Sequence, residues 1–389
     1  THKYLALPIF LGIMLFIFWL TFGALGTSLS DLLGAGIDRL SDITDEALSN
    51  TNISPVLHSL IIDGVFVGVG SVMSFLPIIT ILFFLLSIME DSGYIPRVAF
   101  FMDKLLRRLG LSGRSIVPLL LGFGCSVPAI MATRTLPSKR DRYMTILLVP
   151  FMSCSAKLPI YAMFTAAFFE GHKALVMFSL YITGVIVAII CALLLKSTIF
   201  SGKPVPFIMV LPNYRMPVMK SVWLRMWENI AGFIRRAFTI IFFATIVIWL
   251  LQSFDTGFNM VESSDRSMLA SIGTLAVPVF APLGFGDWRA ATALITGLSA
   301  KEAVVSTFAI LLNAPDSASL PLLMAEVFTP LSAFAFLIFS LLYMPCVAAM
   351  AAARREMGSI LGALATVSFQ TVVAWVAAFL VYNIGELIL

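Results

Sequence analysis

Long apolar segments separated by short charged linkers run through most of this chain. Stretches of about 20 apolar residues, the length that crosses the ~30 Å hydrocarbon layer as a helix, recur along the sequence. They lie at 5–25, 64–89, 143–168, 174–196, 234–253, 329–351 and 360–383. Strands of an outer-membrane barrel would instead be short and alternate apolar with polar residues. The pattern therefore predicts an all-α, polytopic membrane helical bundle.

Two further apolar stretches, 114–133 and 288–312, contain residues that break helices. The first carries Gly122, Gly124 and Pro128 around Cys125, and the second is interrupted at Gly297-Leu-Ser-Ala-Lys-Glu302. Broken helices at membrane depth are tolerated where they line a cavity. We therefore predict two re-entrant hairpins, one entering from each face of the membrane.

The sign of the charge alternates between successive linkers, which orients the predicted helices. Lys and Arg gather at 97–114, 134–142, 203–236 and 354–355, and acidic residues at 31–46, 255–265 and 316–326. Basic linkers stay on the cytoplasmic side. This assignment places the N-terminus inside and, by the same count, the C-terminus outside.

The two halves of the chain resemble each other. Gly122–Thr133 can be aligned with Thr296–Thr307, and each hairpin is followed by a helix with the pattern Met-x-Cys-x-Ala, at Met152 and Met344. Weak similarity with opposite orientation is typical of inverted repeats, whose broken helices hold the transported species near the midplane. We predict a first transmembrane helix and acidic external loop (1–60), a first repeat (61–200), a cytoplasmic interfacial linker (201–232), a second repeat (233–358) and a C-terminal transmembrane helix (359–389).

Two amphipathic stretches, Tyr94–Leu109 and Met219–Ala237, complete this arrangement. The second places Trp223 and Trp227 among basic residues. Aromatic and basic side chains together suit a helix that lies in the cytoplasmic interface, although a helix that binds a partner protein has the same pattern.

The composition supports a membrane protein and narrows its chemistry. Hydrophobic residues make up 60% of the chain and charged residues 12%, with a formal charge of +4. The four cysteines all lie in apolar segments, so we expect no disulfide scaffold. The first apolar stretch is too long for a signal-peptide core, so we expect a retained helix. Nothing in the sequence indicates a nucleic-acid partner.

The cysteines are the first candidates for a metal path, because thiolate and thioether ligands suit the softer transition metals. Cys125 lies at a hairpin break, and Cys154 and Cys346 occupy matching positions of the repeat. Met152 and Met344, two residues before the latter pair, could add thioether ligands. The alternative is that each is a small buried apolar residue, which we favour for Cys191.

Charges inside a membrane are costly and mark functional sites. Glu302 is a candidate cation ligand, with Lys157 or Lys301 as its partner, and a purely structural ion pair fits equally well. We expect the path to pass Gly122, Gly124, Pro128 and Ser299 at the two breaks. Glu90 and Asp91 could guard a cytoplasmic exit or simply be solvated. The sequence contains no zinc-protease, nucleophile-elbow or phosphate-loop motif, so we expect a transport protein rather than an enzyme.

Several of these segments are similar to signature motifs of the ferrous iron transport protein B family. They are Glu90-Asp-Ser-Gly-Tyr94, Gly122–Thr135, Pro150–Pro159, Gly297–Glu302 and Tyr343-Met-Pro-Cys346. The resemblance implies two "Gate" repeats like those of nucleoside carriers, and uptake of Fe²⁺ across a bacterial cytoplasmic (inner) membrane. It maps the family's motif cysteines onto Cys125, Cys154 and Cys346.

The resemblance also implies partners and leaves alternatives open. Family members carry an N-terminal G domain, so GTP would act only through such a domain at the cytoplasmic face, and small accessory iron-uptake proteins are further partners. No covalently bound cofactor is expected, and a homo-oligomer stays open, as does the choice between channel and carrier. The alternatives are a Gate-type carrier of an organic solute such as a nucleoside, and a non-transporting scaffold for a GTPase.

Overall fold

The computed structural model describes residues 6–50, 54–200, 214–234, 239–255, 257, 259–261, 266–312, 314, 319–343 and 346–388. Throughout these residues the secondary structure is helical apart from one isolated bridge between Phe254 and Met260. The first ten α-helices are α1 (Ala6–Phe22), α2 (Ala24–Ser49), α3 (Pro55–Ser59), α4 (Val67–Asp91), α5 (Tyr94–Arg108), α6 (Ile116–Gly124), α7 (Ser126–Ala132), α8 (Lys139–Leu148), α9 (Leu158–Phe168) and α10 (Lys173–Ser197). The others are α11 (Met219–Phe233), α12 (Thr239–Ser253), α13 (Met268–Phe280), α14 (Trp288–Thr296), α15 (Ala303–Leu311), α16 (Leu320–Met324), α17 (Pro330–Leu342), α18 (Val347–Met357) and α19 (Ile360–Ile388).

The apolar helices confirm the predicted fold class, an all-α membrane bundle. Five helical stretches are long and apolar enough to cross a membrane, and up to seven if each of two bent pairs is one span. Four of the five match predicted segments closely: Lys139–Phe168, Glu170–Ser197, Pro330–Met357 and Ile360–Ile388. Hydrophobic length alone therefore located these spans.

The chain forms two compact units, which we describe separately. Unit 1 comprises 1–120, 132–142 and 195–246, and unit 2 comprises 121–131, 143–194 and 247–389. The boundaries of these units differ from those of the predicted repeats, because helices of the first repeat contribute to both units. The predicted domain boundaries remain predictions.

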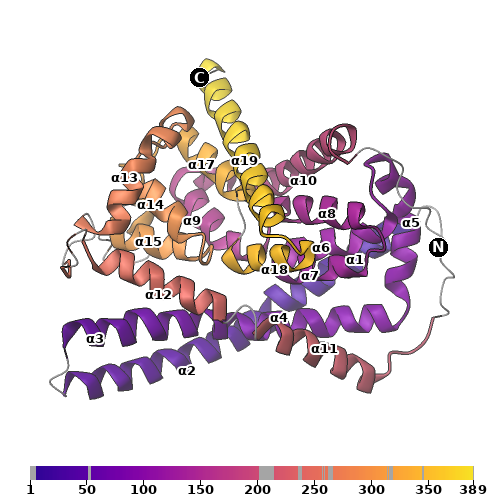
Figure 1. Cartoon of the computed structure of the whole chain (residues 1–389), viewed down its shortest axis with the longest axis horizontal. Coiled ribbons are helices and arrows are strands. Elements are labelled where there is room, and N and C mark those ends of the chain that lie inside the picture. The colour runs from indigo at the N-terminus through magenta and orange to yellow at the C-terminus, as the bar shows by residue number, and fades with distance from the viewer. Residues whose placement is uncertain are drawn as a thin grey trace. The chain divides into compact units, whose positions relative to one another are not determined.

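In unit 1, α4 packs along both α2 and α11 (Figure 1). The acidic stretch expected as an external loop is instead helical, since α2 continues to Ser49 almost directly after α1. The acids Asp31, Asp38 and Asp42 lie on the exposed side of this helix. Acidic residues in the sequence indicate a solvated surface but do not distinguish a loop from the exposed side of a helix, so the predicted loop was wrong.

Both predicted amphipathic helices of unit 1 are present. The chain bends by 81° between α4 and α5 at Gly93, whose φ of 78° is a left-handed conformation that glycine adopts without strain. Helix α11 buries Val222, Met226 and Ile230, one residue per helical turn, while Trp223 and Trp227 are exposed. Residues 235–237, at the end of the second predicted stretch, lie outside the described residues. The interfacial position of these helices remains a prediction.

Unit 2 has a tightly packed aromatic core. Figure 1 shows α17 beside the long C-terminal helix α19, and α13, α14 and α15 packed in sequence. Phe164 of α9 stacks on Phe336 of α17 with ring centroids 4.8 Å apart, and Phe308 and Phe328 meet both rings edge-on. This core joins α15, which follows the second predicted break, to α9 and α17, the helices next to Cys154 and Cys346.

Helix α13 was not predicted from the sequence. The sequence pattern assigns acidic residues to 255–265 and predicts no element over 266–287. In the structure Met268–Phe280 forms an apolar helix capped by Ser267, which accepts a hydrogen bond from the N–H of Ala270. This apolar stretch is shorter than a full membrane span and contains Pro278, so its sequence did not predict a helix. It bends by 106° into α14.

With α13 included, the order of helices in the two halves corresponds one to one. Helices α4 to α10 correspond in order to α12 to α15 followed by α17 to α19, with α16 as an insertion. Gly110 and Gly284, both with positive φ, precede the two aligned hairpin segments by the same interval. This order of helices is the one expected of an internal repeat, and the repeat and its inverted orientation in a membrane remain predictions.

Candidate functional site

The first break lies at Cys125, between α6 and α7, as the sequence predicted. Pro128 has no N–H to donate to the carbonyl oxygen of Gly124, so this helical hydrogen bond cannot form. The Ser155 hydroxyl donates to that oxygen instead, at 3.0 Å. An added side chain at Gly122 would lie 3.1 Å from both Met152 Cβ and the Val149 oxygen. The glycine and proline of this motif therefore hold the first break against the segment that carries Cys154.

Cys154 and Cys346 occupy equivalent local structures. Cys154 has φ −78° and ψ 159° and directly precedes the 3₁₀ turn Ser155–Lys157 that leads into α9. Cys346 has φ −55° and ψ 157° and directly precedes α18. Each cysteine is thus an extended residue between two helical segments of one apolar span. The predicted equivalence of the two positions is reproduced in the backbone, but the helix predicted to continue through each motif is interrupted at the cysteine.

The break between α14 and α15 is held by hydroxyl groups. The hydroxyls of Thr296 and Thr307 lie 2.8 Å apart across it, and Ser299 Oγ donates to the Thr296 oxygen at 2.8 Å. The Val347 N–H, just after Cys346, donates to the Leu298 oxygen at 2.8 Å. This hydrogen bond joins the α14–α15 break directly to the cysteine break of the second half.

The three motif cysteines differ from Cys191 in their exposure. Cys125, Cys154 and Cys346 are each partly accessible, as is Glu302, whereas Cys191 in unbroken helix α10 is only 4% exposed. Cys125 also lies close enough to Cys154, Cys346 and Glu302 to interact with them electrostatically. The structure therefore gathers three thiols and one carboxyl group of unit 2 into an accessible neighbourhood.

This neighbourhood is not a formed metal cage. Among the described residues, no three His, Cys, Asp or Glu side chains are arranged to hold a metal ion together. Met152 is 5% exposed and packs against Gly122, and Met344 lies outside the described residues. The predicted set of ligands therefore remains a prediction.

The two lysines at the breaks are buried and have unlike surroundings. Lys157 Nζ donates to the backbone oxygens of Leu341, Pro150 and Met152 at 2.6, 3.1 and 3.5 Å. Lys301 Nζ lies 3.0 Å from the centre of the Tyr343 ring, a cation–π contact. Lys157 thus directs its ammonium to carbonyls of both halves, and pairing of Glu302 with a lysine remains a prediction.

Glu90 and Asp91 lie at the end of α4 in unit 1 and bind the segment before and within α11. The buried Asp91 carboxylate accepts hydrogen bonds from the Arg215 guanidinium and from the Val218 N–H, the latter at 2.8 Å. Glu90 pairs with Arg225 at 2.7 Å. We had placed both arginines in a basic linker without partners. In the structure Glu90 and Asp91 hold Arg215, Val218 and Arg225 against the end of α4, and we call these contacts the clamp. A role at a cytoplasmic exit remains a prediction.

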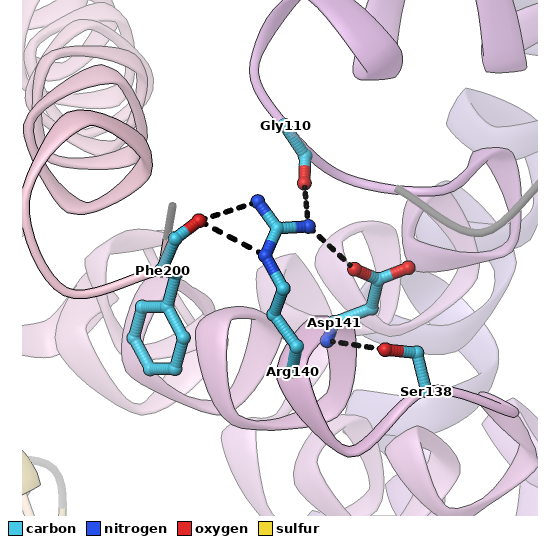
Figure 2. A network of polar contacts seen from close by, with 5 residues as sticks. All are labelled: Gly110, Ser138, Arg140, Asp141 and Phe200. Carbon is cyan, nitrogen blue, oxygen red and sulfur yellow. Dashed lines mark hydrogen bonds and ion pairs between the residues drawn. The ribbon is translucent and has the colours of Figure 1, made fainter. Parts of the chain in front are cut away.

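A second polar network in unit 1 was also missed. Arg140, at the start of α8, donates through Nε and Nη2 to the Phe200 oxygen and through Nη1 to the Gly110 oxygen (Figure 2). Its Nη1 also reaches Asp141 Oδ1 at 3.2 Å. One guanidinium therefore joins the chain beyond α5 to the chain beyond α10. Its place in the basic linker 134–142 gave no sign of this, because the partners are mainly backbone carbonyls that no sequence pattern identifies.

Comparison with known proteins agrees with this arrangement of broken helices. A model of the Gate family, described as "Nucleoside recognition", matches residues 72–168 and 234–360. A second model, "Ferrous iron transport protein B C terminus", matches residues 177–229. Fold and matches together define the class as a polytopic helical membrane protein built on Gate repeats.

Curated relatives identify the branch of that class. The Fe(2+) transporter FeoB of Staphylococcus aureus (strain COL) is 44% identical over the whole chain, and that of Methanocaldococcus jannaschii is 40% identical over 90% of it. A Fe(2+) transport protein A/Fe(2+) transporter FeoB fusion protein of Porphyromonas gingivalis is 38% identical over the whole chain. The chain belongs to the ferrous iron transport protein B family.

The match covers only part of those proteins. The chain spans 58% of the Staphylococcus relative, 52% of the Methanocaldococcus relative and 51% of the fusion protein. No solved structure matches the chain.

Proposed function

We propose that this chain conducts Fe²⁺ across a bacterial cytoplasmic membrane, along the breaks of unit 2. The observation that carries the proposal is the selective exposure of Cys125, Cys154 and Cys346 at those breaks, in contrast to the buried Cys191. A thiol that only fills space has no reason to be accessible. Three such thiols on the helix breaks of a Gate protein are suited to meet an ion.

The chemistry of the neighbourhood suits an ion that must also leave. Cys125, Cys154 and Cys346 would replace part of the hydration shell of Fe²⁺, and Glu302 would balance its charge. Conduction requires binding that is favourable enough for entry and weak enough for release. These four side chains lie in one neighbourhood but do not form a closed metal cage. An ion would therefore meet only a few strong ligands at a time and could be released again.

The candidate residues divide into ligands and supports. Met152 packs against Gly122, so we assign it mainly to positioning, and Met344 stays a candidate thioether ligand. Gly122, Gly124 and Pro128 shape the first break, and Ser299 shapes the break between α14 and α15.

The runner-up function is transport of an organic solute such as a nucleoside, which the printed description of the Gate model favours. Such a site would need amide or carboxylate groups at both hairpin breaks to recognise ribose and base. Residues 121–131 of the first break provide only Ser126 and the Cys125 thiol as side chains able to hydrogen-bond. We therefore rank iron first.

Regulation would come from outside residues 1–389. We assign it no catalytic residue and propose that GTP acts through a G domain, with the basic linkers of unit 1 as the receiving surface. The P. gingivalis relative joins Fe(2+) transport protein A to the transporter in one chain, which supports a small accessory protein as a further partner.

The test is flux into proteoliposomes containing the purified chain, with Fe²⁺ kept reduced and Mn²⁺, Zn²⁺ and a nucleoside as competitors. We expect saturable Fe²⁺ entry that the nucleoside does not inhibit. Nucleoside uptake without metal flux would establish the runner-up instead. If no species enters, the measurement is repeated with a family G domain added, and continued absence of Fe²⁺ flux would refute the proposal.

A further inference from the structure

Lys157 is an ammonium enclosed by backbone carbonyls at the helix breaks. Its residue is 2% exposed, and its three acceptors equal in number the three N–H donors of a protonated amine. Within the described part of the chain, no carboxylate forms an ion pair with it. The hydrogen-bond acceptors that stabilise the charge are therefore peptide carbonyls.

These carbonyls are available because helices end there. Pro150 lies in a short 3₁₀ turn (Val149–Phe151), and Met152 is the extended residue that follows it. Leu341 lies in the last turn of α17, and the residue four positions later is Pro345, which has no N–H to donate. The carboxyl ends of two helical segments thus direct their negative ends at one point.

Carbonyls of unwound helices and helix carboxyl ends are the groups that coordinate monovalent cations in transporters built from broken helices. Here the point at which they converge holds the Lys157 ammonium. The contacts of 2.6 to 3.5 Å come from both halves of the repeat, with Pro150 and Met152 in the first and Leu341 in the second.

We propose that the oxygens of Pro150, Met152 and Leu341 form a monovalent-cation site whose built-in occupant is Lys157. The tethered ammonium stands where a mobile Na⁺ or K⁺ would otherwise be needed to hold the two breaks together. The native protein then needs no bound alkali cation for its stability, and shortening Lys157 creates that requirement. The inference does not depend on which substrate crosses the membrane.

The experiment measures thermal unfolding of the full chain in lipid nanodiscs, without iron, in choline, Na⁺, K⁺ or methylammonium chloride at constant ionic strength. The variants are Lys157→Ala and Lys157→Ser, which leave room for an ion, and Lys157→Met, which fills the space without charge. Lys196→Ala is the matched control, because Lys196 Nζ also caps a helix-end carbonyl, that of Arg108, but is exposed.

The wild type and Lys196→Ala should unfold at the same temperature in all four salts. Lys157→Ala and Lys157→Ser should unfold roughly 5 °C or more lower in choline. At least one small cation should restore half of that loss or more, with saturable dependence on its concentration. Lys157→Met should be destabilised equally in every salt.

The proposal is wrong if the small variants are destabilised equally in all salts, or if the wild type responds to Na⁺ or K⁺ as they do. It is also wrong if neither small variant folds in any salt, because the added cation should then have restored folding. Iron flux is not read in this assay, so its outcome is separate from that of the proposed transport function.

Discussion

Two cations in this chain perform the same task in unlike surroundings. Arg140 in unit 1 and Lys157 in unit 2 each donate to carbonyls left without helical partners. Arg140 donates to those of Gly110 and Phe200, and Lys157 to three carbonyls at two breaks. Arg140 also has Asp141 beside it, and its side chain is 20% exposed. Lys157 is almost fully buried and has only carbonyls.

This difference in burial determines how costly the loss of each side chain is. Arg140 caps carbonyls near solvent, whereas Lys157 caps carbonyls in the interior, away from solvent. Near solvent, water can satisfy the carbonyls if the guanidinium is removed. In an apolar interior, unsatisfied carbonyls and an unpaired charge are both costly, so the ammonium and the oxygens depend on each other. Unit 2 therefore places Lys157 and its carbonyl partners at the helix breaks, next to the partly accessible cysteines.

The largest expected effect concerns function at the breaks. Replacing Cys154 and Cys346 together by Ser should reduce Fe²⁺ flux in proteoliposomes to the level of empty vesicles, because hydroxyls are harder and poorer ligands for this ion. The matched control is Cys191→Ser, in the unbroken helix α10, which should retain flux. Normal flux through the double variant, with normal incorporation into vesicles, would remove these cysteines from the mechanism.

The next effect compares the two caps directly. Lys157→Met should lower the free energy of unfolding by about 3 kcal/mol, because three buried carbonyls lose their donor. Arg140→Met should cost less, about 1–2 kcal/mol, since Phe200 is partly accessible and water can reach its carbonyl, although Gly110 is buried. Both are measured by denaturant unfolding in the same detergent. Equal losses would show that burial does not distinguish the two sites.

A third prediction tests the packing around the cysteine break. An added methyl at Gly184 in α10 would lie 2.5 Å from the backbone oxygen of Phe151, three residues before Cys154, whereas Gly171 has nothing within 4 Å. Gly184→Ala should destabilise the chain by about 1–3 kcal/mol, and Gly171→Ala should stay near wild type. An unchanged melting temperature for Gly184→Ala would show that α10 does not press on this break.

The smallest effect concerns the clamp of unit 1. Asp91→Asn should speed amide hydrogen exchange in 214–222, because the buried carboxylate holds both Arg215 and the Val218 N–H. Glu90→Gln should change exchange little, since the Glu90–Arg225 pair is exposed and such pairs contribute little. Equal exchange in both variants would mean that the segment is held by the apolar face of α11 alone.

The sequence was most informative where local chemistry decides the structure. Pro128 removes one N–H, so a break near Cys125 followed from covalent structure. The Met-x-Cys-x-Ala pattern showed that Cys154 and Cys346 are equivalent positions, but the sequence predicted continuous helices there, and the structure shows breaks. Apolar length located most spans, as lipid requires. These features depend on residues that are neighbours in the chain.

Features that depend on distant partners could not be predicted in this way. Lys157 was a candidate partner of Glu302, but its ammonium bonds to Leu341, which is distant in sequence and identified only by the fold. Arg215 and Asp91 are likewise joined only by packing of α11 on α4. Helix α13 was missed for another reason, because a short apolar helix with an internal proline falls below the length that predicts a span.

The central claim is that an ion path runs past the cysteines at the breaks of unit 2. The most direct test is the rate at which a small membrane-permeant thiol reagent labels each cysteine in the folded protein, read by mass spectrometry, with and without reduced Fe²⁺. We predict that Cys125, Cys154 and Cys346 are labelled and that Fe²⁺ slows their labelling, while Cys191 stays unlabelled. Labelling of those three cysteines that is independent of Fe²⁺, or labelling of Cys191 as fast as theirs, would contradict the account.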